Sequence, residues 1–195
     1  MNEFKDSVDF LRNKYMGVPC NSFEEASRMA VEAAKVVGNS FKVKSYPFRI
    51  GTALRELGFV VLVKNFSDEN LSGILATNTK NGTKLAASVN KNDSPGHQAF
   101  ALAHELAHYI FDIKDLTTQR YVANYRTDIE KPEDLSEFRA NKFAANLLMP
   151  MNEFINIYKK VCEKLTNEDF IAVVMSNYFG VSKTAIERRI GEIGL

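Results

Sequence analysis

The stretch AHELAHYIF, residues 103–111, holds two of the chain's three histidines, four residues apart with a glutamate between them. In an α-helix each residue turns by about 100°, so His104, Glu105 and His108 fall on one side of the helix. Imidazoles at positions i and i+4 have Cβ atoms about 6 Å apart, and from that separation both rings reach one ion at about 2.1 Å. The spacing therefore predicts a metal site on this helix.

The surroundings of the histidine pair support this prediction. Residues 99–111 are otherwise alanine, leucine, isoleucine, phenylalanine and tyrosine, so the helix is expected to be buried. Buried ionisable groups are costly unless they are satisfied, and one bound cation satisfies all three. HExxH is the pattern of zinc peptidases, in which the glutamate is the general base. The alternative is two hydrogen-bonded core histidines beside a structural glutamate. His97 fits no part of the pattern and is expected at the surface.

A catalytic zinc site needs three protein ligands and an open position for water. The segment EFRANKFAANLLMP, residues 137–150, supplies Glu137 on one helical stripe with Ala140, Asn141 and Ala144. The alanines allow close approach to the helix at 95–112, so Glu137 is expected at a buried seam as the third ligand. Asn141, one turn later, is placed to accept the free ring N–H of a ligating histidine. The alternative for Glu137 is a solvated side chain at the edge of an amphipathic helix.

Composition excludes several classes of protein. A chain of 195 residues suits one compact domain, and a net charge of +1 gives no global attraction to nucleic acid or acidic membranes. Cys20 and Cys162 fit no CxxC or zinc-ribbon spacing and are expected to be reduced. The N-terminus has no apolar segment typical of a secretory signal, and the longest aliphatic run, Val60–Val63, is too short for a membrane span. We therefore expect a cytoplasmic protein.

Apolar periodicity and capping residues predict an α+β fold. Helices are expected at 3–15, 23–37, 47–57, 95–112, 133–148, 151–164, 167–179 and 183–190. Strands are expected at 59–66, 72–79 and 84–90, the last two joined by a tight hairpin at Asn81-Gly82. The expected architecture is a small antiparallel three-stranded sheet packed on a mostly helical domain. The polar connection 114–131 is either a loop over a site or a surface segment.

The C-terminal segment, residues 166–195, is expected to form two helices joined by a short glycine turn, as in a helix-turn-helix. Lys183, Arg188 and Arg189 give the last helix a basic side that could meet phosphates. The alternative is an ordinary solvated face. Nucleic acid is thus a weakly supported partner.

The stretches AHELAHYIF, EFRANKFAANLLMP and FGVSKTAIERRI together resemble the ImmA/IrrE family of bacterial and phage metallopeptidases, over roughly residues 45–194. The resemblance implies a compact, gluzincin-like (zincin-like) peptidase in which His104, His108 and Glu137 bind one Zn²⁺ and Glu105 is catalytic. Family members typically cleave a helix-turn-helix repressor, often encoded beside them, and so release genes for mobile-element excision or stress response. Ala107 stands where family members often carry glycine, on the side away from the metal.

The resemblance also suggests a division of the chain. Residues 1–44 match no pattern and are expected to form an N-terminal helical extension. Residues 45–165 are expected to form the zinc peptidase core, with the helix-turn-helix-like segment 166–195 packed on it.

In the predicted mechanism, Glu105 takes a proton from zinc-bound water as that water attacks a peptide carbonyl. The oxyanion donor is undetermined, and five residues are candidates: Tyr109, Arg120, Tyr121, Tyr125 and Arg126. If the strand 84–90 is an edge strand, an extended substrate can pair with it. Nitrogen and carboxylate ligands also accept Mn²⁺.

The residues predict a zinc metallopeptidase that cleaves a protein substrate, and the family resemblance implies that this substrate is a helix-turn-helix repressor. One alternative is a non-proteolytic regulator that keeps a structural metal and sequesters a repressor or binds DNA. Another is the toxin half of a toxin–antitoxin pair.

Overall fold

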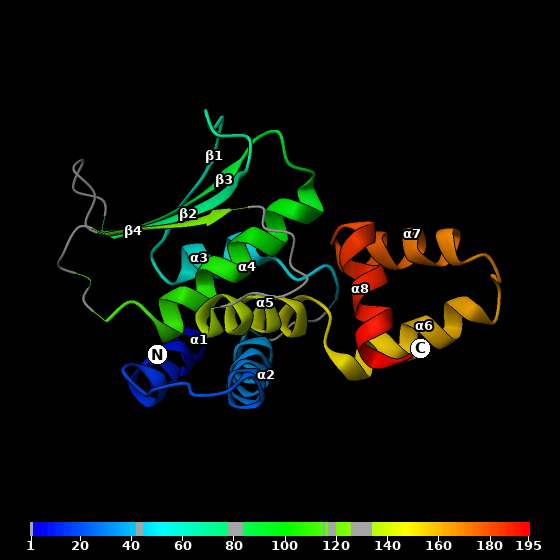
Figure 1. Cartoon of the computed structure of the whole chain (residues 1–195), viewed down its shortest axis with the longest axis horizontal. Helices are drawn as coiled ribbons and strands as arrows, with labels where there is room; N and C mark the ends of the chain where they lie inside the picture. Colours follow the sequence, from blue (N-terminus) through cyan, green and yellow to red (C-terminus); the bar gives the residue numbers. More distant parts are fainter. Residues whose placement is uncertain (1, 42–44, 78–83, 115, 117–119, 126–133) are drawn as a thin grey trace.

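The computed structural model describes residues 2–41, 45–77, 84–114, 116, 120–125 and 134–195, and for residues 120–125 it describes the backbone alone. The elements confirm the α+β class (Figure 1). The helices are α1 (Glu3–Tyr15), α2 (Phe23–Ser40), α3 (Ile50–Glu56), α4 (Pro95–Phe111), α5 (Leu135–Leu148), α6 (Met151–Cys162), α7 (Glu168–Phe179) and α8 (Lys183–Ile193). The strands are β1 (Val60–Lys64), β2 (Leu71–Thr77), β3 (Leu85–Asn90) and β4 (Arg120–Tyr125). All eight predicted helices are present, although α3 begins three residues after the expected start at Pro47.

The sheet differs from the expected three-stranded antiparallel one in two respects. It has four strands in the order β1-β3-β2-β4, and the additional strand, β4, lies within the connection 114–131. It is also mixed, because β3 runs parallel to β1. The expected antiparallel pairing of β2 with β3 is confirmed, and β2 also pairs antiparallel with β4. The hairpin turn at Asn81-Gly82 lies outside the described residues.

Burial explains the strand order. Every residue of β3 is buried, whereas β1 exposes Val60 and Val63. A strand that is apolar on both faces is most stable inside a sheet, where neighbouring strands satisfy both edges and its two faces are covered. β3 therefore takes a central position and β1 an edge. The prediction that an extended substrate pairs with residues 84–90 required an edge strand, and it is wrong because β3 has a partner on each side.

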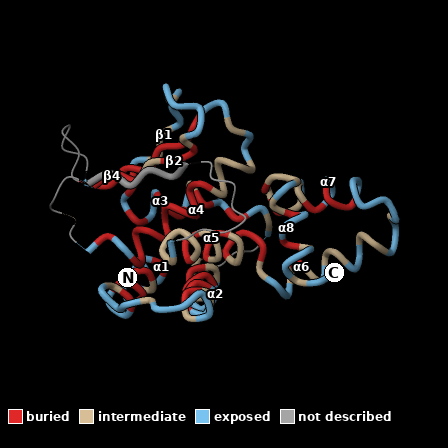
Figure 2. Tube along the Cα trace, in the orientation of Figure 1, coloured by how far each residue is buried: buried red, intermediate tan, exposed pale blue. Residues whose placement is uncertain are grey.

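Helix α4 lies between the sheet and α5 (Figure 1). α4 packs against α5, whose buried residues include Ala140 and Ala144, and these small side chains let the two backbones approach closely. α2 packs against α5, and α1 contacts both α2 and α4. The buried positions form one continuous core that includes these two N-terminal helices (Figure 2).

The C-terminal helices α6 to α8 lie beside the N-terminal end of α4 (Figure 1). Gly96, in the first turn of α4, approaches the turn between α7 and α8 so closely that a Cβ atom there would lie 2.4 Å from the carbonyl carbon of Val181. Arg189 is 1% exposed and donates hydrogen bonds to Asn146 Oδ1 at 2.8 Å and to the Met149 carbonyl at 3.1 Å. The prediction that Arg189 faces phosphates is therefore wrong, because the guanidinium fastens α8 to the end of α5.

Other surface features follow the sequence more closely. Lys183 pairs with Asp169 and, at 3.3 Å, with Glu187, so its charge on α8 is compensated. Cys20 and Cys162 are free thiols, as expected. Within the described part of the chain, none of the helices has the length and hydropathy of a bilayer-spanning segment.

The close approach at Gly96 predicts a specific sensitivity. Gly96→Ala is expected to lower the free energy of unfolding by about 1–3 kcal/mol, because the new methyl group meets backbone atoms that cannot move without displacing the α7–α8 turn. Gly191→Ala is the matched control, since a Cβ there meets nothing within 4 Å and alanine favours the helix by about 0.5–1 kcal/mol. Urea unfolding of both variants measures the difference, and equal midpoints would contradict the close contact.

Candidate metal centre

The three residues of the HExxH pattern lie at the buried middle of α4. His104, Glu105 and His108 are 1%, 0% and 3% exposed. The helix begins where the sequence predicts, because Ser94 accepts a hydrogen bond from the His97 amide at 3.3 Å and Pro95 occupies the first turn. The histidine side of α4 faces α5, whose first turn carries Glu137.

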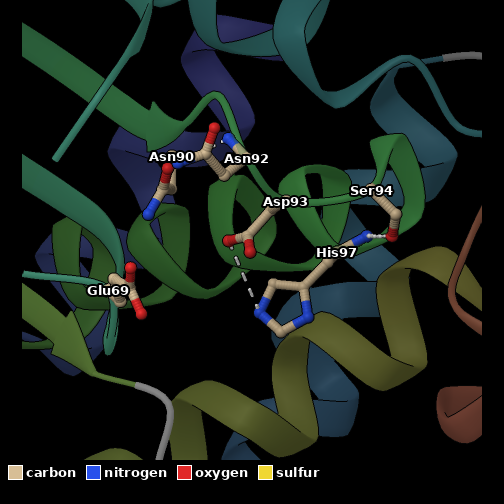
Figure 3. Close-up of a pocket in the computed structure, with 6 residues that line it drawn as sticks. All are labelled: Glu69, Asn90, Asn92, Asp93, Ser94 and His97. Atoms are coloured by element: carbon tan, nitrogen blue, oxygen red, sulfur yellow. Dashed lines mark hydrogen bonds and ion pairs between the residues drawn. The ribbon is translucent and has the colours of Figure 1, made fainter.

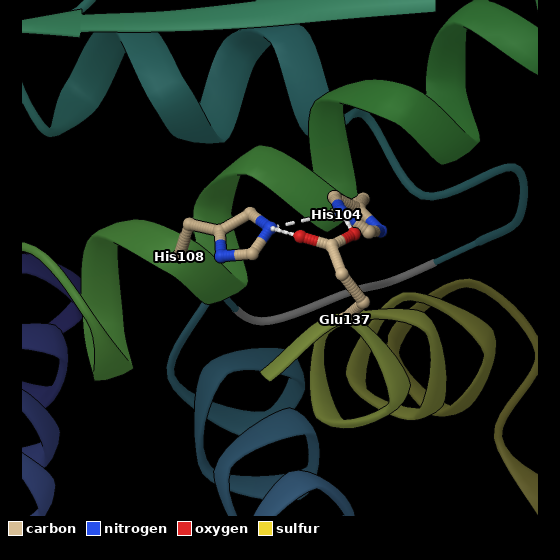
Figure 4. Close-up of side chains that lie close together, drawn as sticks. All are labelled: His104, His108 and Glu137. Atoms are coloured by element: carbon tan, nitrogen blue, oxygen red, sulfur yellow. Dashed lines mark hydrogen bonds and ion pairs between the residues drawn. The ribbon is translucent and has the colours of Figure 1, made fainter. Parts of the chain in front are cut away.

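Three ligand atoms converge between the two helices (Figure 4). His104 Nε2 lies 3.2 Å from Glu137 Oε2, His108 Nε2 lies 3.2 Å from Glu137 Oε1, and the two Nε2 atoms are 2.9 Å apart. A tetrahedral ion with bonds of about 2.1 Å places its ligand atoms about 3.4 Å apart. The observed separations are close to that value, so the cluster fits a small divalent ion with little movement. The Glu137 side chain is 39% exposed, which leaves this side of the centre open to solvent.

Each imidazole is oriented by a hydrogen bond at its other nitrogen. His104 Nδ1 lies 2.8 Å from Asn141 Oδ1, the partner position expected from the sequence. His108 Nδ1 lies 2.8 Å from Asp112 Oδ2. When Nδ1 donates to these oxygens, the lone pair of Nε2 points to the centre in both rings, which is the tautomer that a metal requires.

Asp112 was not identified from the sequence as part of the site. It follows His108 by four residues, which is the spacing that places two side chains on one helix face. Its carboxylate accepts hydrogen bonds from Ser136 Oγ at 2.9 Å and from Arg139. Arg139 is 5% exposed, and its guanidinium carbon lies 4.5 Å from the centre of the Phe111 ring. α5 therefore supplies both a candidate ligand, Glu137, and the groups that fix Asp112.

The charges of the cluster are strongly coupled. Burial raises the pKa of Glu137, but hydrogen bonds to the two histidines outweigh it and hold that pKa well below its usual range. Burial lowers the pKa of His104. For His108, burial also lowers the pKa, but the bonds to Asp112 and Glu137 outweigh it and raise the pKa to about 10. The centre is thus electrostatically suited to a cation.

Glu105 occupies a different position from the three candidate ligands. Burial raises its pKa to about 8, and neither carboxylate oxygen has a hydrogen-bond partner among the described residues. β2 passes so close that a Cβ atom on Gly73 would lie 3.1 Å from Glu105 Oε1. A fully buried carboxyl group without partners is costly. A metal with a bound water beside it would remove that cost, so the residues present fit a hydrolytic metal centre.

The proposed oxyanion donors receive little support. Tyr109 is 6% exposed, stacks edge-on against Phe59 at 5.0 Å and lies under the Arg12 guanidinium at 3.9 Å. It is therefore a core residue whose contacts are with α1 and the start of the sheet. The side chains of Arg120, Tyr121 and Tyr125, and the whole of Arg126, lie outside the described residues.

His97 lies two turns before His104 and takes no part in the cluster. Its Nε2 atom is 3.1 Å from Ser72 Oγ and 3.8 Å from Asp93 Oδ2, and its side chain is 42% exposed, as expected for a surface position. It borders a polar cavity of about 390 Å³ at the N-terminal end of α4 (Figure 3). The other residues that line the cavity are Glu69, Asn90, Asn92, Asp93 and Ser94.

The fold and this centre define an α+β protein with a two-histidine, one-carboxylate site of the kind that binds a divalent metal. Residues 54–191 match the IrrE N-terminal-like domain, which is a peptidase family, and the chain belongs to that family. It is thus a metallopeptidase-like protein of the IrrE and ImmA kind, which confirms the resemblance seen in its motifs.

Among solved structures, a Mycobacterium tuberculosis transcriptional regulator has a similar fold, with a TM-score of 0.52 and 14% sequence identity. The similarity covers 96% of this chain and 52% of the other, so this chain spans about half the length of the regulator. At this identity the likeness concerns the fold alone. No curated protein matches the sequence.

The convergence of ligand atoms predicts tight zinc binding. The chelator-treated chain is expected to take up one zinc per molecule, and zinc at a hundredfold excess over its Kd should add about 2.7 kcal/mol to the free energy of unfolding. His104→Ala should abolish both effects, because it leaves two ligands. His97→Gln is the control, since His97 is the histidine outside the cluster. Zinc stabilisation that survives His104→Ala but not His97→Gln would place the metal elsewhere.

The raised pKa values predict that the metal-free fold weakens at alkaline pH. Glu105 keeps its proton up to a pKa of about 8 in the folded chain but only to 4.5 when unfolded, so its stabilising effect is lost as pH rises through this window. His108 acts in the same direction between its unfolded value of 6.5 and about 10. Each group lowers the free energy of unfolding by at most about 1.4 kcal/mol for each pH unit within its window.

Urea unfolding of the chelator-treated chain between pH 6 and 9 measures this loss of stability. Glu105→Gln, which cannot ionise, should lose less stability over the same range. Equal losses in the two proteins would show that Glu105 does not hold a proton in the metal-free fold.

Proposed function

We propose that the chain is a zinc-dependent endopeptidase in which His104, His108 and Glu137 bind one Zn²⁺ and Glu105 is the general base. The observation that carries the proposal is the convergence of two Nε2 atoms and one carboxylate beside a fully buried carboxyl group without partners. Mn²⁺ is compatible with the same ligands, and a metal analysis of the purified protein distinguishes the two.

The residues divide the work of peptide hydrolysis. His104, His108 and Glu137 would hold the zinc ion, which would supply a water of lowered pKa and would polarise the scissile carbonyl. Glu105, buried beside the centre with no hydrogen-bond partner among the described residues, would accept a proton from the attacking water and would pass it to the leaving amine. Asn141 and Asp112 keep the imidazoles in the required tautomer and orientation throughout.

The substrate is proposed to be a protein segment in extended conformation. β2 crosses over Glu105 at Gly73, and β4 pairs with β2 on the side away from β3. Among the described residues, β4 is therefore an edge strand of the sheet next to β2, and it also contacts α4. An extended peptide that pairs with the outer edge of β4 would lie along the sheet beside the centre.

We propose a helix-turn-helix repressor in the cytoplasm as the substrate, which is the substrate class that the resemblance of the motifs to the ImmA/IrrE family implies. Cleavage would separate the DNA-binding part of such a repressor from the rest and so relieve repression.

The proposal predicts that Glu105→Gln retains zinc and loses cleavage. The loss should be at least about a hundredfold, because proton transfer by a positioned base contributes about 10²–10⁴ to the rate. Incubation of the purified chain with the helix-turn-helix regulator encoded nearest to it, with and without chelator, followed by sequencing of fragments, measures this. Glu187→Gln, an exposed glutamate on α8, is the matched control and should cleave normally.

Relief of repression in cells by Glu105→Gln would contradict the proteolytic proposal. That outcome would favour a regulator that binds and sequesters its partner without cutting it.

A further inference from the structure

The C-terminal turn of α4 is fastened by two buried arginines from different helices. Arg139 of α5 binds the Asp112 carboxylate. Arg12 of α1, which is 6% exposed, donates from one guanidinium nitrogen to the Tyr109 carbonyl and from the other to the Ile113 carbonyl, the latter at 2.9 Å. The Arg12 guanidinium also lies 3.9 Å from the centre of the Tyr109 ring.

This arrangement satisfies a requirement of the helix end. The last carbonyls of an α-helix have no partner within the helix, and here that end is buried. A planar guanidinium can bind two carbonyls at once, and its positive charge opposes the negative end of the helix dipole. Burying a charged side chain is costly, so Arg12 is stable in this position only because both carbonyls and the ring face accept it.

The turn that Arg12 binds is also the turn that orients His108. The amides of Asp112 and Ile113 both donate to the His108 carbonyl, at 2.9 Å and 3.1 Å, and the Asp112 carboxylate binds the His108 ring. Arg12 therefore fixes the backbone of residues 109–113, and Arg139 fixes the carboxylate that this backbone carries. A shift of the turn would move Asp112 relative to the imidazole and tilt Nε2 away from the centre.

We propose that Arg12 is a positioning residue of the metal centre, acting on His108 through the C-terminal turn of α4 and Asp112. The inference rests on the proposed metal site. Arg12 lies outside residues 54–191, the part of the chain that matches the family, so this contact is a feature of the N-terminal helices of this protein.

The test compares zinc affinities, measured by competition with a chromophoric chelator on the full chain. Arg12→Gln should weaken zinc binding by about 10- to 100-fold, the range typical for groups that orient a metal ligand. Arg12→Lys keeps the charge but not the two-carbonyl geometry, and it should show a smaller loss. The combination of Arg12→Gln with Asp112→Asn should cost less than the product of the two single effects, because both act on the same histidine.

Phe4→Ala is the matched control for a purely structural effect. Phe4 is a buried residue of the same helix that packs against Phe41 at 5.0 Å, so its loss weakens the attachment of α1 without removing the Arg12 contacts. Its zinc affinity should stay within about twofold of the unaltered chain. Should Arg12→Gln fail to fold, Arg12→Lys decides the question by the same measurement.

Three results would overturn the positioning role: unchanged zinc affinity in the Arg12 variants, an equal loss in Phe4→Ala, or full additivity with Asp112→Asn. Failure of the unaltered chain to bind zinc would instead overturn the proposed function, and this inference with it.

Discussion

The mutual satisfaction of two imidazoles and one carboxylate, enclosed between α4 and α5, is the constraint on which the rest of the structure depends. His104 and His108 are almost fully buried, and the Nε2 atom of each lies 3.2 Å from a carboxylate oxygen of Glu137. Such groups are tolerated in a core only when their partners are held at fixed positions. Buried alanines of α5, Ala140 and Ala144, favour that proximity, because small side chains let the two backbones approach. The glycine of β2 that faces Glu105 does the same from the sheet.

The two histidines are supported unequally, and the difference has chemical consequences. His104 is bound by the neutral amide of Asn141, whereas His108 is bound by the carboxylate of Asp112. A carboxylate partner makes an imidazole a more basic ligand, and it adds a negative charge next to the metal position. Arg139 offsets that charge, since its guanidinium binds the same carboxylate. The charges therefore alternate in sign outward from the metal position, with a negative carboxylate at Asp112 of α4 and a positive guanidinium at Arg139 of α5.

The sequence predicts those parts of the site that depend on local spacing. The pair His104 and His108 follows from helical geometry, and the position of Asn141 follows from its distance of one turn from Glu137. Asp112 has the same local signal relative to His108, but one carboxylate near the end of a helix is not distinctive. Arg12 gives no local signal, because its partners lie 97 and 101 residues away. The order of the strands cannot be predicted from the sequence for a similar reason. Hydrophobic patterning identifies β1 and β3 as strands, but only the burial of all of β3 decides which of them is central.

The part of the chain that matches the family is shorter than the part that shares one hydrophobic core. Similarity to the family begins at residue 54, yet each of the two helices that carry the candidate metal ligands packs against a helix from before that point. α2 lies along α5 with a face of alanines, and α1 binds the end of α4 through Arg12. These contacts belong to one continuous apolar core. Removing the N-terminal helices would therefore expose the apolar residues of α4 that contact α1 and those of α5 that contact α2. The N-terminal helices therefore complete the scaffold of the candidate metal centre, although none of the three candidate ligands lies on them.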